Sequence, residues 1–94
     1  MTKDLYIISS VFHLLIAAAV AVSRPNNKTY WVFTRFNQKR FQALQPCLLN
    51  LVESVDQVLY LDDSIISVKQ RKKNAGILLN FAKDCHISQI FVGN

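Results

Sequence analysis

Short apolar runs alternate along the chain with longer segments that have helical spacing. Four runs of four to six residues are rich in aromatic and β-branched side chains and are bounded by polar residues, which is the pattern of buried strands. They are Leu5–Ile8, Thr29–Thr34, Gln57–Leu61 and Ser88–Val92. The segments between them predict helices, so strands and helices should alternate from a first strand to a fourth.

The three predicted helices carry apolar residues at three- and four-residue steps. The first follows Ser9-Ser10 and stops at Arg24-Pro25, because proline disfavours helix in the residue before it. The second spans 37–53 and contains Pro46, which predicts either a kink or a late start. The third spans about 67–85. The residues expected to face the sheet are Phe41, Leu44, Leu48, Leu51 and Val52 in the second helix and Ala75, Leu78, Leu79, Ala82 and Cys85 in the third.

This order predicts one α/β domain over residues 1–94. We expect a three-layer, Rossmann-like sheet of four parallel strands in the order 3-2-1-4, connected by three right-handed crossover helices. The first two helices then cover one face and the third covers the other. Because parallel sheets are normally covered on both faces and the chain stops directly after its fourth strand, we expect either an amino-terminal fragment of a longer protein or a domain whose bare sheet face pairs with itself or another subunit.

The strand order predicts a ligand site between the first and fourth strands. Open α/β sheets bind ligands outside the carboxyl ends of their strands, at the point where the strand order reverses. Ser9 and Ser10 end the first strand, His13 follows in the first helical turn, and Gly93 and Asn94 end the fourth strand. These five residues are therefore candidate binding residues. A purely structural alternative remains open, in which Ser10 only caps the helix and His13 is a satisfied structural histidine.

Two further polar pairs end the second and third strands. Thr34 and Arg35 could contribute a phosphate or carboxylate contact, and Asp62 and Asp63 could bind a metal ion or a sugar hydroxyl. An ordinary strand exit and turn is the favoured explanation for Asp62 and Asp63, so we predict no metal site there. The sequence contains no Gly-rich phosphate loop, metal-ligand cluster or nucleophile-elbow motif, which argues against a dinucleotide or metal cofactor.

The charge balance favours anionic partners. The 94 residues carry a net charge of +5, and 51% of them are apolar, as expected for a folded domain. Four of the cations, Lys69, Arg71, Lys72 and Lys73, cluster at the start of the third helix. A solvated helix face explains such a cluster, and contact with an anionic membrane surface is the alternative. The absence of an aromatic ladder or a reader motif argues against nucleic acid.

Cysteine usage and the amino-terminal segment bear on location. Cys47 and Cys85 lack metal or redox spacing, so we expect two buried thiols in a reducing cytoplasm. A secretory signal is an alternative for residues 5–23, which contain no charge and end in small residues. Ser9, Ser10 and His13 interrupt its apolar run, which favours the cytoplasmic strand and helix, with peripheral contact at the inner membrane left open.

The opening Leu5-Tyr-Ile-Ile-Ser-Ser-Val-Phe-His-Leu-Leu15 resembles the amino-terminal motif of bacterial sialyltransferases of glycosyltransferase family 52 and related capsule polysialyltransferases. Those chains open with a strand, a small polar pair and Pro-Phe-Gln/His-Leu-Leu; Val11 stands here where proline is usual. The ending Ile90-Phe-Val-Gly-Asn94 is also similar to the family's strand before an Asn-Asp segment. The resemblance covers about a third of a full family member.

The resemblance implies the first of two Rossmann-like halves of a GT-B enzyme that transfers sialic acid from CMP-sialic acid to a lipooligosaccharide or capsule glycan without a metal. It assigns the acceptor side to this half, with Ser9, Ser10, His13, Gly93 and Asn94 as the matching residues. The catalytic residues would lie beyond Asn94, so the 94 residues alone should be inactive. The alternative is a stand-alone α/β binding or interaction module that forms homo-oligomers through an uncovered sheet face.

Overall fold

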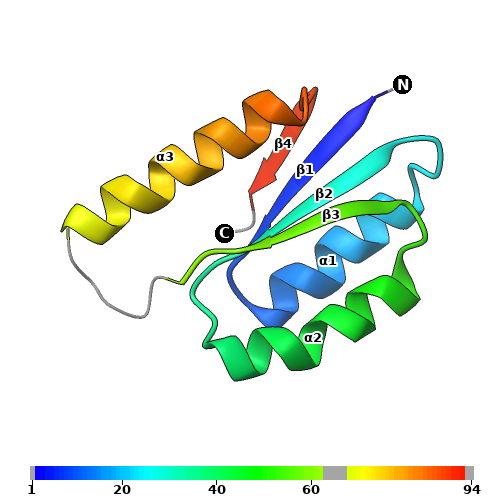
Figure 1. Ribbon diagram of the computed structural model, residues 1–94. Helices are drawn as coiled ribbons and strands as arrows, with labels where there is room; N and C mark the ends of the chain where they lie inside the picture. The colour runs from blue at the N-terminus through cyan, green and yellow to red at the C-terminus, as the bar shows by residue number, and fades with distance from the viewer. Residues whose placement is uncertain (1, 63–67, 93–94) are drawn as a thin grey trace.

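The structure, a computed structural model, describes residues 2–62 and 68–92 and contains seven secondary-structure elements in strict alternation. They run β1 (Lys3–Ile8), α1 (Val11–Val22), β2 (Lys28–Phe33), α2 (Gln38–Leu51), β3 (Val55–Tyr60), α3 (Val68–Asp84) and β4 (Gln89–Val92) (Figure 1). The alternation of strands and helices predicted from the hydrophobic pattern is therefore confirmed.

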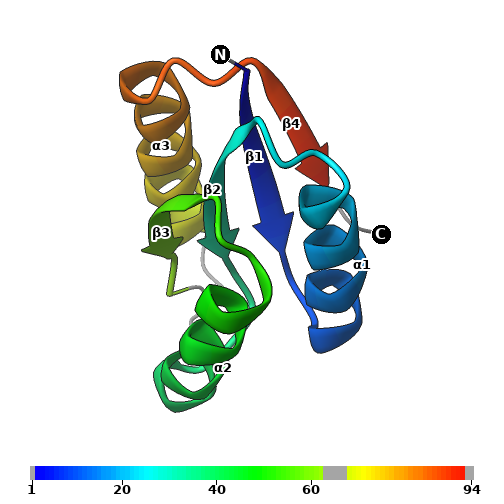
Figure 2. The ribbon, with the colours of Figure 1, turned by 90° about the vertical axis from the view of Figure 1, so that its right-hand side faces the viewer.

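The four strands form one parallel sheet in the order β3-β2-β1-β4. Helices α1 and α2 cover one face and α3 covers the other, as two perpendicular views show (Figures 1 and 2). The fold is thus the three-layer, Rossmann-like α/β arrangement that the element order predicted. Its topological switch point lies between β1 and β4, because the strands that follow β1 are added on one side of it up to β3, whereas β4 is added on the other side.

A row of aromatic rings crosses the sheet beneath α1. Tyr6 pairs in register with Trp31 on one side and Phe91 on the other, and its ring centroid lies 4.5 Å and 4.8 Å from theirs. The indole N–H of Trp31 donates to the hydroxyl of Thr29 at 2.9 Å, so the buried ring keeps a hydrogen-bond partner. This row links the edge strand β4 to the central strands.

Helix α3 packs on the opposite face and corrects one sequence prediction. Leu78, Phe81 and Ala82 pack against the buried cluster of that face, which includes Leu5, Tyr30 and Cys85. Leu79 was predicted to face the sheet but is 63% exposed, and Ala75 is also exposed. The apolar residues of α3 allow two overlapping stripes, and contact with the sheet selects the one that contains Phe81.

Helix α2 shows that Pro46 is tolerated inside a helix. The helix begins at Gln38, where the side chain of Asn37 accepts the backbone N–H of Arg40 at 2.7 Å, so the late start is wrong. Leu48 is fully buried as predicted, whereas Leu51 is half-exposed. Both cysteines are free, but only Cys85 is buried; Cys47 is exposed on α2, contrary to prediction.

Buried polar groups tie the amino ends of the strands together. Asp4 is fully buried and accepts hydrogen bonds from Nε of Arg24 at 2.9 Å and from Nδ2 of Asn27 at 3.0 Å. Arg24 also donates to Oε1 of Gln89 at 2.8 Å and lies over the ring of Phe91. The side chain of Arg24 therefore joins the end of α1 to both β1 and β4.

Helix α1 is the most apolar helix and yet leaves much of its surface exposed. Leu14, Ala18 and Ala21 face the sheet, whereas Phe12, Leu15, Ile16 and Val22 are at least half-exposed. Its 12 residues span about 18 Å, less than the roughly 30 Å of a bilayer core. In the part of the chain that the structure describes, no helix is long and apolar enough to span a membrane.

Candidate functional site

Ser9 and His13 meet at the carboxyl end of β1. Ser9 leaves the strand just before α1 begins, and His13 lies four residues later in the first turn of the helix. This spacing brings the Ser9 hydroxyl to within 3.0 Å of Nδ1 of His13, a hydrogen bond in a partly buried setting. The hydroxyl and the imidazole form one polar unit whose donor and acceptor roles depend on the ring tautomer.

Ser10 has the structural role that the sequence left open. Its backbone is extended (φ −155°, ψ 164°), its side chain accepts the backbone N–H of His13 at 3.2 Å, and its carbonyl accepts that of Leu14 at 3.1 Å. These are the contacts of a helix N-cap. Of the two serines, Ser9 is therefore the one that contacts the imidazole.

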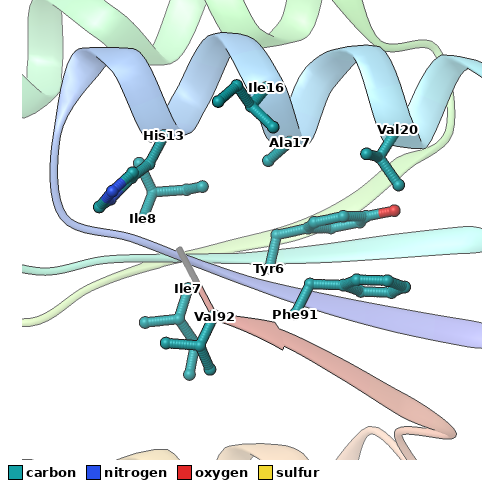
Figure 3. A pocket seen from close by; sticks show the side chains of 9 residues that line it. All are labelled: Tyr6, Ile7, Ile8, His13, Ile16, Ala17, Val20, Phe91 and Val92. Atoms are coloured by element: carbon teal, nitrogen blue, oxygen red, sulfur yellow. The ribbon is translucent and has the colours of Figure 1, made fainter. Parts of the chain in front are cut away.

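A groove lies beside this polar unit, between α1 and the β1–β4 pair (Figure 3). Its volume is about 230 Å³, and its surface is mostly apolar. The rings of Tyr6 and Phe91 lie on the sheet side, Ile16, Ala17 and Val20 on the helix side, and His13 at the end nearest the strand carboxyl ends. The groove has room for a small chemical group with an apolar face. The imidazole of His13 lies at one end of the groove.

The location of the groove and one of its lining residues, His13, were predicted, but sequence reasoning missed the other lining residues. Tyr6 and Phe91 are 85 positions apart and become neighbours only because β1 pairs with β4. Their aromatic character predicts a core position as readily as a groove. The one usable signal was the switch-point rule, which identifies the two strands but not the side chains.

Thr34 lies next to Ser9 on the neighbouring strand end. Its backbone N–H donates to the carbonyl of Ile8 at 2.9 Å, directly after the last pair of the β1–β2 register, Ile8 with Phe33. Arg35 follows with a positive φ of 65° and an exposed side chain. A non-glycine residue in this region costs about 1–2 kcal/mol, and such strain is concentrated at functional sites.

Asp62 stands apart from this cluster. It follows β3, two strands away from β1, which is about 10 Å across the sheet. Its carbonyl accepts a hydrogen bond from Nδ2 of Asn74 on α3 at 3.3 Å, which ties it to the opposite face. The structure therefore brings Ser9, Ser10, His13 and Thr34 together but leaves Asp62 outside. The other predicted residues, Asp63, Gly93 and Asn94, lie outside the described residues.

Hydroxyl and imidazole groups make up the polar part of this edge. Across residues 2–62 and 68–92, no group of three His, Cys, Asp or Glu side chains could hold a metal ion. The polar groups near the groove are a hydroxyl pair, an imidazole and the hydroxyl of Thr34. Such groups donate and accept hydrogen bonds to a neutral, hydroxylated ligand.

No family model, curated protein or solved structure matches this chain. Fold and site together define a Rossmann-like α/β domain with a hydroxyl–imidazole pair and an apolar groove at its switch point.

Proposed function

We propose that this chain is the amino-terminal, acceptor-side domain of a bacterial glycosyltransferase that transfers sialic acid from CMP-sialic acid to a surface glycan. The observation that carries the proposal is the hydrogen-bonded pair of Ser9 and His13, 3.0 Å apart beside the groove. Both residues belong to the Leu5–Leu15 segment that resembles the sialyltransferase opening motif. A Rossmann-like sheet is also the architecture that each half of a GT-B enzyme requires.

The groove favours a sugar as the acceptor, because it has an apolar surface and a polar end, and a pyranose has an apolar C–H face and polar hydroxyl groups. The C–H face of a sugar packs on apolar surface, and most of the groove surface is apolar. Sugar hydroxyls need donors and acceptors, which Ser9 and His13 supply at one end. In this proposal the domain binds and orients the acceptor hydroxyl.

The transfer then requires groups from outside these 94 residues. The acceptor oxygen bonds to the anomeric carbon of sialic acid, the bond from that carbon to the CMP phosphate oxygen breaks, and CMP leaves with the electron pair. The acceptor proton passes to a base in the second half of the enzyme. In this proposal, the two halves of the enzyme accelerate the transfer by holding the donor and the acceptor in position.

The exposed apolar surface of α1 is also consistent with a larger enzyme. A helix with apolar residues on all sides is normally buried within a larger core. Phe12, Leu15 and Val22 are more than half-exposed and contain no polar atom in their side chains. Packing against a second half of the enzyme would remove them from water.

Calorimetric titration tests the proposal. Lactose should bind saturably to the 94-residue chain, and His13→Ala should weaken the affinity about tenfold, the effect of one hydrogen bond of roughly 1.4 kcal/mol. His86→Ala is the matched control, because His86 is exposed at the end of α3, away from the groove. CMP-sialic acid should give little heat, since its site belongs to the other half. Strong CMP-sialic acid binding that His13→Ala leaves unchanged would contradict this division.

A second candidate is a stand-alone interaction module that self-associates, and two exposed residues on β4 favour it. Ile90 and Val92 are 56% and 65% exposed, and Val92 points away from α1 (Figure 3). Under this alternative, sedimentation velocity shows a dimer that Val92→Lys converts to a monomer, while lactose does not bind. The control Gln57→Lys changes an exposed residue of β3, at the opposite sheet edge, and should leave the dimer intact.

A further inference from the structure

The outward face of α3 carries a regular row of exposed residues. Helix α3 contacts the sheet through Leu78, Phe81 and Ala82. The opposite side, at alternating three- and four-residue steps, presents Lys69, Lys72, Gly76, Leu79 and Lys83, all of them exposed. The helix has 17 residues and is about 25 Å long, so this row forms an extended surface. We call it the α3 surface.

The α3 surface is strongly basic. Helix α3 contains five cations, Lys69, Arg71, Lys72, Lys73 and Lys83, and its single acidic residue is Asp84 at the last position. Four of the cations lie in the first two turns, where the positive end of the helix dipole disfavours them. Within the described residues, none of the five forms an ion pair with a carboxylate. Among residues 2–62 and 68–92, this positive charge has no carboxylate paired with it, and an anionic partner would neutralise it.

Exposed apolar side chains accompany these cations. Leu79 is 63% exposed within the row, and Val68 is 70% exposed on the same side at the start of the helix. Gly76 lies between Lys72 and Lys83 and adds no side chain. A basic helix face with exposed aliphatic residues suits the boundary between anionic headgroups and acyl chains. Proteins that bind single-stranded nucleic acid normally stack aromatic side chains on the bases. The one aromatic residue of α3, Phe81, faces the sheet.

We propose that α3 binds an anionic membrane surface through Lys69, Lys72, Lys83 and Leu79. The geometry allows this contact and the site to coexist, because the groove lies on the α1 side of the sheet and α3 on the other (Figures 1 and 3). The exposed apolar residues of α1 offer no competing electrostatic attraction, since α1 contains no charged residue. The proposal does not depend on the identity of the sugar or on the glycosyltransferase assignment.

Vesicle sedimentation tests the α3 surface. The 94-residue chain is mixed at 0.1 M NaCl with vesicles of 30% phosphatidylserine in phosphatidylcholine, or of phosphatidylcholine alone. We expect binding to the anionic vesicles only. Each lysine near such a surface contributes roughly fivefold to partitioning, so Lys69→Glu with Lys72→Glu should reduce it by at least about 25-fold.

A matched control separates the effect of the α3 surface from the effect of the net charge of the chain. Lys39→Glu with Arg40→Glu makes the same change in charge on exposed residues of α2, on the other side of the sheet, and should reduce partitioning far less. Leu79→Ser should weaken vesicle binding severalfold while leaving binding to a single-stranded RNA oligomer unchanged. All these side chains are exposed, and far-UV circular dichroism verifies that each variant is folded.

Three results would overturn the proposal. The first is equal vesicle binding by the α3 and α2 charge-reversal variants. The second is equal partitioning of the unmodified chain to anionic and neutral vesicles. The third is tighter, α3-dependent binding to RNA than to the vesicles, which would reassign the surface to nucleic acid.

Discussion

Arg24→Ala should lower the free energy of unfolding by about 3 kcal/mol, because it leaves the carboxylate of Asp4 buried without its cation. Asp4 is fully buried, and its remaining hydrogen-bond donor would be the Asn27 amide. We expect the low end of the range for broken buried pairs, since the Arg24 side chain is 34% exposed and water can partly replace it. Urea denaturation followed by circular dichroism at pH 7 measures the change.

The control for this experiment is Lys28→Ala. Lys28 is an exposed cation at the start of β2, close to the same edge of the sheet, and its loss should change stability by less than about 0.5 kcal/mol. Arg24→Lys keeps the charge but not the guanidinium geometry that joins Asp4 to Gln89, so it should fall between the two. Equal stability of Arg24→Ala and Lys28→Ala would show that the buried pair contributes nothing.

Stability should also fall steeply between pH 10 and pH 12. Burial, followed by the nearby negative charge of Asp4, raises the pKa of Tyr6 to about 12, and burial together with Asp56 raises the pKa of Tyr30 to about 12. Because these folded-state pKa values exceed the unfolded value of about 10, the stabilisation is complete below pH 10. It is lost as the pH rises through 12, by up to about 3 kcal/mol for each tyrosine.

Tyr6→Phe measures how much of this loss of stability comes from the ionisation of Tyr6. Among the described residues, the buried Tyr6 hydroxyl has no hydrogen-bond partner of standard geometry, but it lies near the carboxylate of Asp4, so its removal should cost no more than about 1 kcal/mol at pH 7. The variant should then lose about half as much stability as the unmodified chain between pH 10 and pH 12. Urea midpoints at one-unit pH intervals give both curves, and parallel curves would show that Tyr6 does not titrate with unfolding.

Local sequence chemistry was sufficient to predict the elements and their order. Ser10 caps α1 because a serine hydroxyl satisfies a free N–H in the first turn, a contact between residues three positions apart. The short β-branched and aromatic runs became strands for a similarly local reason. Once the elements alternate, right-handed crossovers and the pairing of neighbours leave few arrangements, and the order 3-2-1-4 was among them.

Side-chain orientation on the helices was predictable only in part. On α3, the spacing of apolar residues fits a stripe through Leu79 as well as one through Phe81, and the two differ by a rotation of the helix about its axis. In the structure, the stripe through Phe81 faces the sheet, and Phe81 packs edge-on against Tyr30 at a centroid distance of 6.3 Å. Leu79 is thereby exposed among the lysines, and the membrane proposal follows from that position.

The sequence by itself thus determined the α/β class, the alternation of strands and helices and the Ser9–His13 spacing, because each depends on residues near one another in the chain. The strand order was predictable only through the general rules for parallel sheets with right-handed crossovers. Only the tertiary structure decided that Tyr6 and Phe91 form the groove, that Arg24 joins Asp4 to Gln89, and that Leu79 faces outward. Those features depend on the pairing of β1 with β4 and on the docking of α3, contacts between segments far apart in the chain. Side-chain packing between these segments sets the geometry of these features, and the hydrophobic periodicity of the sequence carries no information about that packing.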